Sequence, residues 1–223
     1  MGYDPAMGDM RLLVWLPLLL LAGCAGTQDT TLFRAAETGD RPGIEAALSR
    51  GADVNRKNAG GMTALILAAR AGSVPAVRAL LHHGANPGLG GGANAWPPLM
   101  HAIHKNRLEA ARALLDGGAQ VDGRGRSGET ALMMAAGYGY TPLVELLLER
   151  GANPRAETPA GYNVLAAALG GVPDIDRFTM GSCQAAVVQA LKRKDPSLRL
   201  PDNLWARVAQ FSAGVGKLLG CKY

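Results

Sequence analysis

Small and apolar residues return along this chain with a period of about 33 residues. A leucine inside an apolar run marks each period, and a Gly-Ala pair keeps the same spacing. The leucines are Leu32, Leu65, Leu99, Leu132 and Leu165, and the pairs begin at Gly51, Gly84, Gly118 and Gly151. Because two markers stay in phase over about 140 residues, the pattern predicts a stack of repeated units.

The second unit shows how the pattern predicts two helices per unit. Thr63 precedes a run rich in alanine and is expected to cap a first helix, which Gly72 ends in a left-handed conformation. Ser73 is expected to cap a second helix, with Pro75 in the first turn, where a missing N–H is tolerated. The apolar residues of that second helix recur at helical spacing, at Val77, Leu80 and Leu81.

The same start and stop signals return in the other units. Second helices are expected to start at Asp40 with Pro42 and at Thr141 with Pro142, and first helices to end at Gly39, Asn106 and Gly139. The sequence therefore predicts an all-α repeat solenoid of about five helix-turn-helix units.

Two places interrupt the period. A glycine-rich stretch, 88–93, precedes the third unit and accounts for its one extra residue. In the fifth unit a loop over 170–181 delays the second helix to about 183–192. The remaining tail has Leu204, Val208, Phe211 and Val215 at helical spacing, which predicts a C-terminal capping helix. We therefore assign residues 171–223 to an atypical terminal repeat and cap.

Composition agrees with this assignment. The 223 residues are 48% hydrophobic and only 5% aromatic. This content is too apolar for a disordered chain and suits the close packing of small residues between helices.

The first 23 residues read as a targeting signal. The apolar run over 12–22 follows Arg11 and is too short to span a bilayer. The sequence Leu21-Ala22-Gly23-Cys24 resembles the bacterial lipoprotein box, which implies removal of residues 1–23 and lipidation of Cys24. Residues 24–30 then form a short tether. An ordinary signal peptide with a cysteine by chance is the alternative, and translation from Met7 or Met10 would remove an acidic start.

The C-terminal part of the chain is basic and contains two cysteines that could form a disulfide, Cys183 and Cys221. From Val187 onward the sequence has seven basic and two acidic residues, whereas the repeats are close to neutral. Such a tail either binds anionic headgroups or forms a solvated helix face. After lipidation of Cys24, Cys183 and Cys221 remain, and an oxidising periplasm favours a disulfide between them over two buried thiols.

Over residues 31–170 the units resemble the ankyrin repeat. The resemblance rests on the Thr-Ala-Leu step, the Ala-Ala pair, the Leu-Leu pair and the Gly-Ala-x-x-Asn ending, as in 128–136 and 51–55. The family's consensus histidine is replaced, by Ile66, Met100, Met133 and Ala166, so its hydrogen bond between turn and helix is expected to be absent.

The resemblance implies protein binding through hairpin tips and exposed positions of the first helices. Carried onto this chain, these positions are Lys57, Met62, Arg70, Trp96, His104, Lys105, Arg124, Arg126, Glu129, Tyr138, Glu157 and Tyr162. Trp96 with Tyr138 and Tyr162 forms the favoured patch, because Trp, Tyr and Arg dominate interface hot spots. Plain structural packing is the alternative for each of them.

Other chemistry finds little support in the sequence. His82, His83, His101 and His104 lack carboxylates at a spacing that would complete a metal site. No phosphate-binding loop or nucleophile with its base is recognisable, and no nucleic-acid motif accompanies the basic tail. We therefore expect no enzyme activity, cofactor, metal or nucleic acid.

The expected function is that of a monomeric binding module, lipid-anchored in the bacterial envelope and facing the periplasm, with the outer membrane favoured because Ala25 follows the cysteine. Its partner would be a periplasmic or membrane-proximal protein. The chain itself would act as an inhibitor, an immunity-type protein or an assembly factor. An envelope structural protein that holds anionic lipid or cell wall is the alternative.

Overall fold

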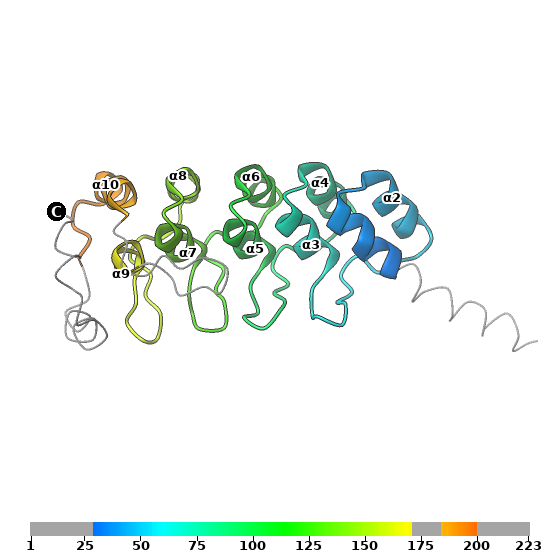
Figure 1. Ribbon diagram of the computed structural model, residues 1–223, viewed down its shortest axis with the longest axis horizontal. Helices are drawn as coiled ribbons and strands as arrows, with labels where there is room; N and C mark the ends of the chain where they lie inside the picture. The colour runs from blue at the N-terminus through cyan, green and yellow to red at the C-terminus, as the bar shows by residue number, and fades with distance from the viewer. Residues whose placement is uncertain (1–28, 171–183, 200–223) are drawn as a thin grey trace, which may run out of the picture.

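The computed structural model describes residues 29–170 and 184–199, and these form two parallel rows of helices (Figure 1). One row is formed by the first helices of the units, and the other by the second helices. Residues 29–38 are helical, followed by α2 (Arg41–Ser49), α3 (Ala64–Ala71), α4 (Val74–His82), α5 (Pro98–His104), α6 (Leu108–Asp116), α7 (Ala131–Tyr138), α8 (Thr141–Glu149), α9 (Val164–Gly170) and α10 (Ala185–Lys194). These elements confirm the all-α repeat solenoid.

Hairpin loops extend from the row of first helices (Figure 1). Each is closed by a single antiparallel bridge, and the bridges are Lys57 with Thr63, Gly91 with Trp96, Arg124 with Thr130, and Glu157 with Asn163. Neighbouring helices of each row contact one another along the stack, as α3, α5, α7 and α9 do in the first row.

The predicted helix starts are confirmed by hydrogen bonds of the capping side chains. The hydroxyl of Thr63 accepts from the backbone N–H of Ile66 at 3.3 Å, and that of Ser73 accepts from Ala76 at 3.4 Å. The carboxylate of Asp40 accepts from Gly43 at 3.1 Å. Each cap satisfies a backbone donor that has no partner inside its own helix.

The predicted helix ends are confirmed by backbone conformation. Gly72 and Gly139 adopt φ of 83° and 75°, and Asn106 adopts 54° in the equivalent place of the third unit. A β-carbon at Gly72 would lie 2.7 Å from Cδ of Arg107, so any larger residue there would also have to displace the Arg107 side chain of the next unit.

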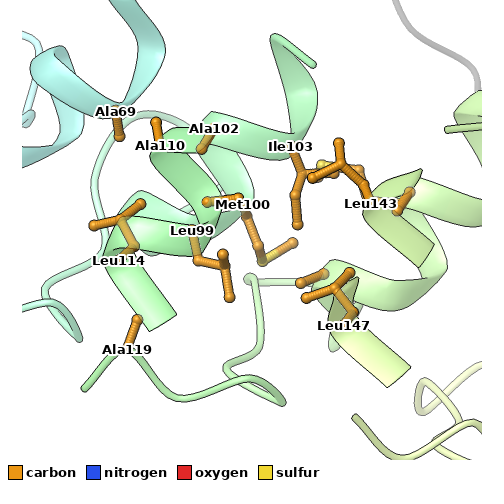
Figure 2. Close-up of a cluster of buried hydrophobic side chains, with 14 of the residues drawn as sticks. Ala69, Leu99, Met100, Ala102, Ile103, Ala110, Leu114, Ala119, Leu143 and Leu147 are labelled. Carbon is orange, nitrogen blue, oxygen red and sulfur yellow. The ribbon is translucent and has the colours of Figure 1, made fainter. Parts of the chain in front are cut away.

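The core runs continuously between the two rows. Small residues of the first helices, such as Ala68 and Ala69, are fully buried and allow neighbouring units to approach closely. Larger side chains fill the space that remains, and one cluster combines Leu99, Met100, Ile103, Leu114, Leu143 and Leu147 from α5, α6 and α8 (Figure 2).

The third unit differs from the others in its hairpin. The bridge between Gly91 and Trp96 encloses four residues, whereas that between Lys57 and Thr63 encloses five. One residue is added before the bridge and another between Trp96 and α5, where Pro97 occupies the cap position without a side-chain hydrogen bond. The single added residue of the unit therefore reflects changes both before and after the bridge, and not in the glycine-rich stretch alone.

The chain ends differ in part from expectation. Asp29 and Thr30, assigned to the tether, are helical, and buried Asp29 accepts from the N–H of Asp53 at 3.0 Å. Residues 29 and 30 therefore belong to the helical array and not to the expected tether. The second helix of the fifth unit, α10, lies two residues later than expected.

Several predicted features lie outside the described residues. These are the signal peptide over 1–23, Cys24, Cys183, Cys221 and the capping helix over 204–215. In the part of the chain that the structure describes, no helix combines the length and apolar character needed to cross a bilayer.

Candidate protein-binding site

A small pocket lies where the hairpin of the third unit, residues 91–96, meets the first helices of the second and third units. Its volume is about 180 Å³. It is lined by Met62, Arg70, Gly91, Gly92, Ala93, Asn94, Trp96, His101, His104 and Lys105, and we call it the Trp96 pocket. Five predicted binding residues therefore line one cavity: Met62, Arg70, Trp96, His104 and Lys105.

The indole of Trp96 is held from two sides. Its Nε1–H donates to Oε1 of Glu129, one unit further along, at 2.6 Å. The ring lies 5.4 Å from that of His104 and 5.6 Å from that of His101, measured between centroids. The other oxygen of Glu129, Oε2, is buried and has no hydrogen-bond partner in the structure. The half-buried tryptophan is thus fixed in place while part of its ring stays accessible.

The aromatic contacts continue along the first helices as far as α7. Nδ1 of His104 lies 2.9 Å from the hydroxyl oxygen of Tyr138, whose ring stacks on Tyr140 at 5.3 Å. Tyr138 is only 8% exposed, which corrects its expected exposed position and makes it a support for His104. Tyr162 packs against the hydrophobic core of the array, and burial raises its pKa to about 12.

His101, which also lines the pocket, holds the hairpin of the third unit. It is 5% exposed, and its Nε2–H donates to the carbonyl of Gly91 at 3.3 Å. Burial lowers its pKa to about 4, with smaller contributions in the same direction from Arg70 and His104. His101 is therefore neutral at physiological pH. It supplies a bond between turn and helix one position after Met100, where that bond was expected to be absent.

Arg70 places a positive charge at the wall of the pocket. Its side chain is half-buried, and Nη1 lies 3.4 Å from the sulfur of Met62. A thioether sulfur is a weak acceptor. Among the described residues, no carboxylate forms an ion pair with Arg70.

Two other predicted cations connect neighbouring hairpins. Nζ of Lys57 donates to the carbonyl of Gly90 at 2.7 Å, and Nη1 of Arg124 donates to that of Glu157 at 2.9 Å. Both bonds span 33 residues, so each joins one hairpin to the hairpin of the next unit. Both side chains are exposed but serve the scaffold. Arg126 and Glu157 are also exposed, further along the hairpin tips.

The four histidines lie in two separate places. His82 and His83 lie at the end of α4, in the row of second helices, whereas His101 and His104 lie on α5. Nowhere in residues 29–170 and 184–199 do three His, Cys, Asp or Glu residues gather closely enough to hold a metal ion.

The sequence pattern did not place Tyr140 at the site, and it offered His101 only as a candidate metal ligand, although both support the site. His101 occupies a core position by periodicity, which hides its polar role. Its spacing of three from His104, on one face of a helix, is the signal that connects it with the pocket.

Comparisons with known proteins agree with the repeated architecture. The family described as "Ankyrin repeats (3 copies)" matches residues 16–91 and 87–158, and thus begins before the array expected from residue 31. Relatives include the B-cell lymphoma 3 protein homolog of Mus musculus, 36% identical over 49% of this chain and 25% of that protein. A putative ankyrin repeat-containing protein of Treponema pallidum is 35% identical over 54% of this chain and 40% of that protein.

A further relative carries an enzyme's name. The glycerophosphocholine phosphodiesterase gde1 of Schizosaccharomyces pombe is 33% identical over 59% of this chain, but the match covers only 11% of that enzyme. The chain spans less than half the length of each of these relatives. Since the family match extends over more than half of the chain, and the helices repeat with the same period, the chain belongs to the ankyrin repeat family.

Proposed function

We propose that this protein is a membrane-tethered interaction module that binds a periplasmic partner protein with the hairpins and first helices of its array. Membership in the ankyrin repeat family supports protein–protein interaction in general. The partner and the location are the finer part of the proposal. An inhibitor, an immunity-type protein and an assembly factor all act in this way, by covering a surface of another protein.

The observation that carries the proposal is the fixed, partly accessible indole of Trp96. Its N–H is already bonded to Glu129 and its ring lies against His104, so binding a partner orders few additional degrees of freedom. A large, rigid aromatic group beside a cavity is the usual form of an interface hot spot.

The lipoprotein box around Cys24 supports the tether. Helical structure is already present at Asp29, so few residues separate the proposed lipid from the folded array. Such a short connection would hold the binding face close to the membrane, and the partner would be found there.

The alternative, an envelope structural protein, rests on the basic tail. Part of that tail is engaged within the fold: Arg193 pairs with Glu145 at 3.3 Å, and Nζ of Lys192 donates to the carbonyl of Leu198 at 2.9 Å. These contacts tie part of the basic tail to the fold, and for that reason we favour the array as the binding surface.

Cross-linking in cells followed by affinity capture of the tagged chain would separate the two functions. Trp96→Ala should remove the specific cross-linked partner, whereas Arg78→Ala, an exposed position on α4, should retain it. Charge reversal of Lys192, Arg193 and Lys194 should have no effect on the partner. If the partner survives Trp96→Ala and is lost with the tail reversal, the array is not the binding surface.

The tether has its own test. Cys24→Ser, or treatment with the signal-peptidase inhibitor globomycin, should prevent maturation to the lipidated form. Metabolic labelling with a fatty-acid analogue should mark the unaltered chain only. Equal labelling and unchanged processing of the Cys24→Ser chain would contradict the lipid anchor.

A further inference from the structure

We propose that the Trp96 pocket accepts an Asp or Glu side chain of the partner protein, with Arg70 as its counter-charge. This inference rests on the proposed function and names the chemistry of its partner at one site.

The first support is the charge of the pocket wall. The lining contains two basic residues, Arg70 and Lys105, and two histidines, but no Asp or Glu. Glu129 holds the indole of Trp96 but is not part of the lining. A cavity with cations and no carboxylate complements an anionic group.

The second support is the state of Arg70. Within the described part of the chain its guanidinium bonds only to the sulfur of Met62, which is a weak acceptor. A guanidinium carries five N–H donors in a planar fork, and a carboxylate matches that fork with two parallel hydrogen bonds. Arg70 therefore retains N–H donors that can bind a carboxylate of the partner protein.

Size decides between a side chain and a small-molecule ligand. A volume of about 180 Å³ lies below the range of roughly 300–1,000 Å³ that is usual for cofactor and metabolite sites. The cavity suits one carboxylate side chain, with the indole of Trp96 beside its methylene groups. The remaining contacts would come from the flanking hairpins.

The wall of the pocket is also preorganised. Two hydrogen bonds fix the hairpin of the third unit. One runs from His101 to the carbonyl of Gly91, and the other from the backbone N–H of Arg126 to the carbonyl of Asn94 at 2.9 Å. Because these groups are held before binding, little of the electrostatic attraction is offset by the entropy of ordering the loop.

A peptide library provides a probe that does not require the natural partner. Twelve-residue peptides displayed on phage are selected on the full chain, and the strongest are synthesised for binding measurements. The enriched peptides should share an Asp or Glu, and its replacement by Asn or Gln should weaken binding roughly tenfold. Arg70→Gln should weaken binding of the acidic peptide by a similar factor.

The combination of both changes tests the contact itself. With Arg70→Gln, replacing the acidic residue of the peptide by its amide should have little further effect, since the paired interaction is already lost. Arg78→Gln removes the same charge in the same unit, but on α4 outside this pocket, and should leave binding within about twofold. Arg70→Lys should restore part of the affinity, and circular dichroism checks that each variant is folded.

Other outcomes separate this inference from the proposed function. If Trp96→Ala abolishes peptide binding but Arg70→Gln leaves the acidic preference intact, the binding face stands and the carboxylate pocket is wrong. If Trp96→Ala leaves binding unchanged, the binding face itself is wrong. No acidic residue among enriched peptides, or no enriched peptide, also overturns the carboxylate pocket.

Discussion

At the scale of single residues, the pocket depends on polar side chains that are buried or half-buried. Glu129 accepts from the indole of Trp96, and His101 donates to the hairpin that carries that indole. Neither bond was predictable, because each joins residues whose separation in space depends on how successive units stack. The positions of Met62, Arg70, Trp96, His104 and Lys105 were predictable, since the repeat pattern places them in the hairpins and on the first helices, whereas the burial of Tyr138 was not.

The pairing of Trp96 with Glu129 predicts a non-additive pair of mutations. Trp96→Phe keeps an aromatic ring but removes the N–H donor, so it leaves the carboxylate without its partner. We expect the free energy of unfolding to fall by about 1–3 kcal/mol. Adding Glu129→Leu should recover most of that loss in urea denaturation. Additive losses in the double variant would contradict the contact.

His101 predicts a defined dependence of stability on pH. Its pKa falls from 6.5 to about 4 on folding, so the unfolded chain binds a proton first as the pH is lowered. The stability contribution of neutral His101 is complete above pH 6.5 and is lost progressively between pH 6.5 and 4, by on the order of 3 kcal/mol.

Urea denaturation at stepped pH provides the measurement. His101→Gln keeps an N–H donor but does not titrate, so its stability should vary less with pH over this window. His82→Gln, on the row of second helices, is the matched control and should follow the unaltered chain. Parallel curves for His101→Gln and the unaltered chain would show that folding does not lower the pKa of His101.

At the scale of helices and hairpins, local signals determined the fold well. Thr63, Ser73 and Asp40 cap the helices they were expected to cap, because capping involves residues only three positions apart. The hairpin of the third unit was less predictable. Its bridge register depends on how Trp96 and Pro97 pack against adjacent units, which no local pattern contains.

Alanine substitutions at two glycines of one unit distinguish the cost of backbone strain from the cost of steric crowding. Gly72 and Gly84 share a φ of +83°, but a β-carbon at Gly72 would lie 2.7 Å from Arg107, whereas one at Gly84 meets nothing within 4 Å. Gly84→Ala should lower the free energy of unfolding by about 1 kcal/mol. Gly72→Ala should lower it by roughly 1–2 kcal/mol more. Equal losses in chemical denaturation would mean that Arg107 moves away freely.

At the scale of the whole molecule, contacts pass from each unit to the next. The hydrogen bonds of Lys57 and Arg124 to the following hairpin, and the contacts within each row of helices, are all of this kind. Stability in such an array is approximately a sum over units and their interfaces. The effect of a mutation therefore depends on its position along the stack.

Leu114 and Leu191 test this dependence, because both are fully buried but one is central and the other lies in α10. Either change to alanine should remove about 2–5 kcal/mol of local packing. Hydrogen exchange should then rise only around α9 and α10 for Leu191→Ala, but across several units for Leu114→Ala. Uniform acceleration in both variants would indicate a single cooperative unit instead.

The altered hairpin of the third unit also makes one binding position along the array different from the others. A perfectly periodic stack would present the same surface at every unit, and a partner could bind in several shifted positions of similar energy. The displaced bridge makes Trp96 the bridge residue where the other units have Thr63, Thr130 and Asn163, so one position along the stack is distinguishable from the rest. A single irregular loop can thus convert a repeating surface into one that a partner binds in one register.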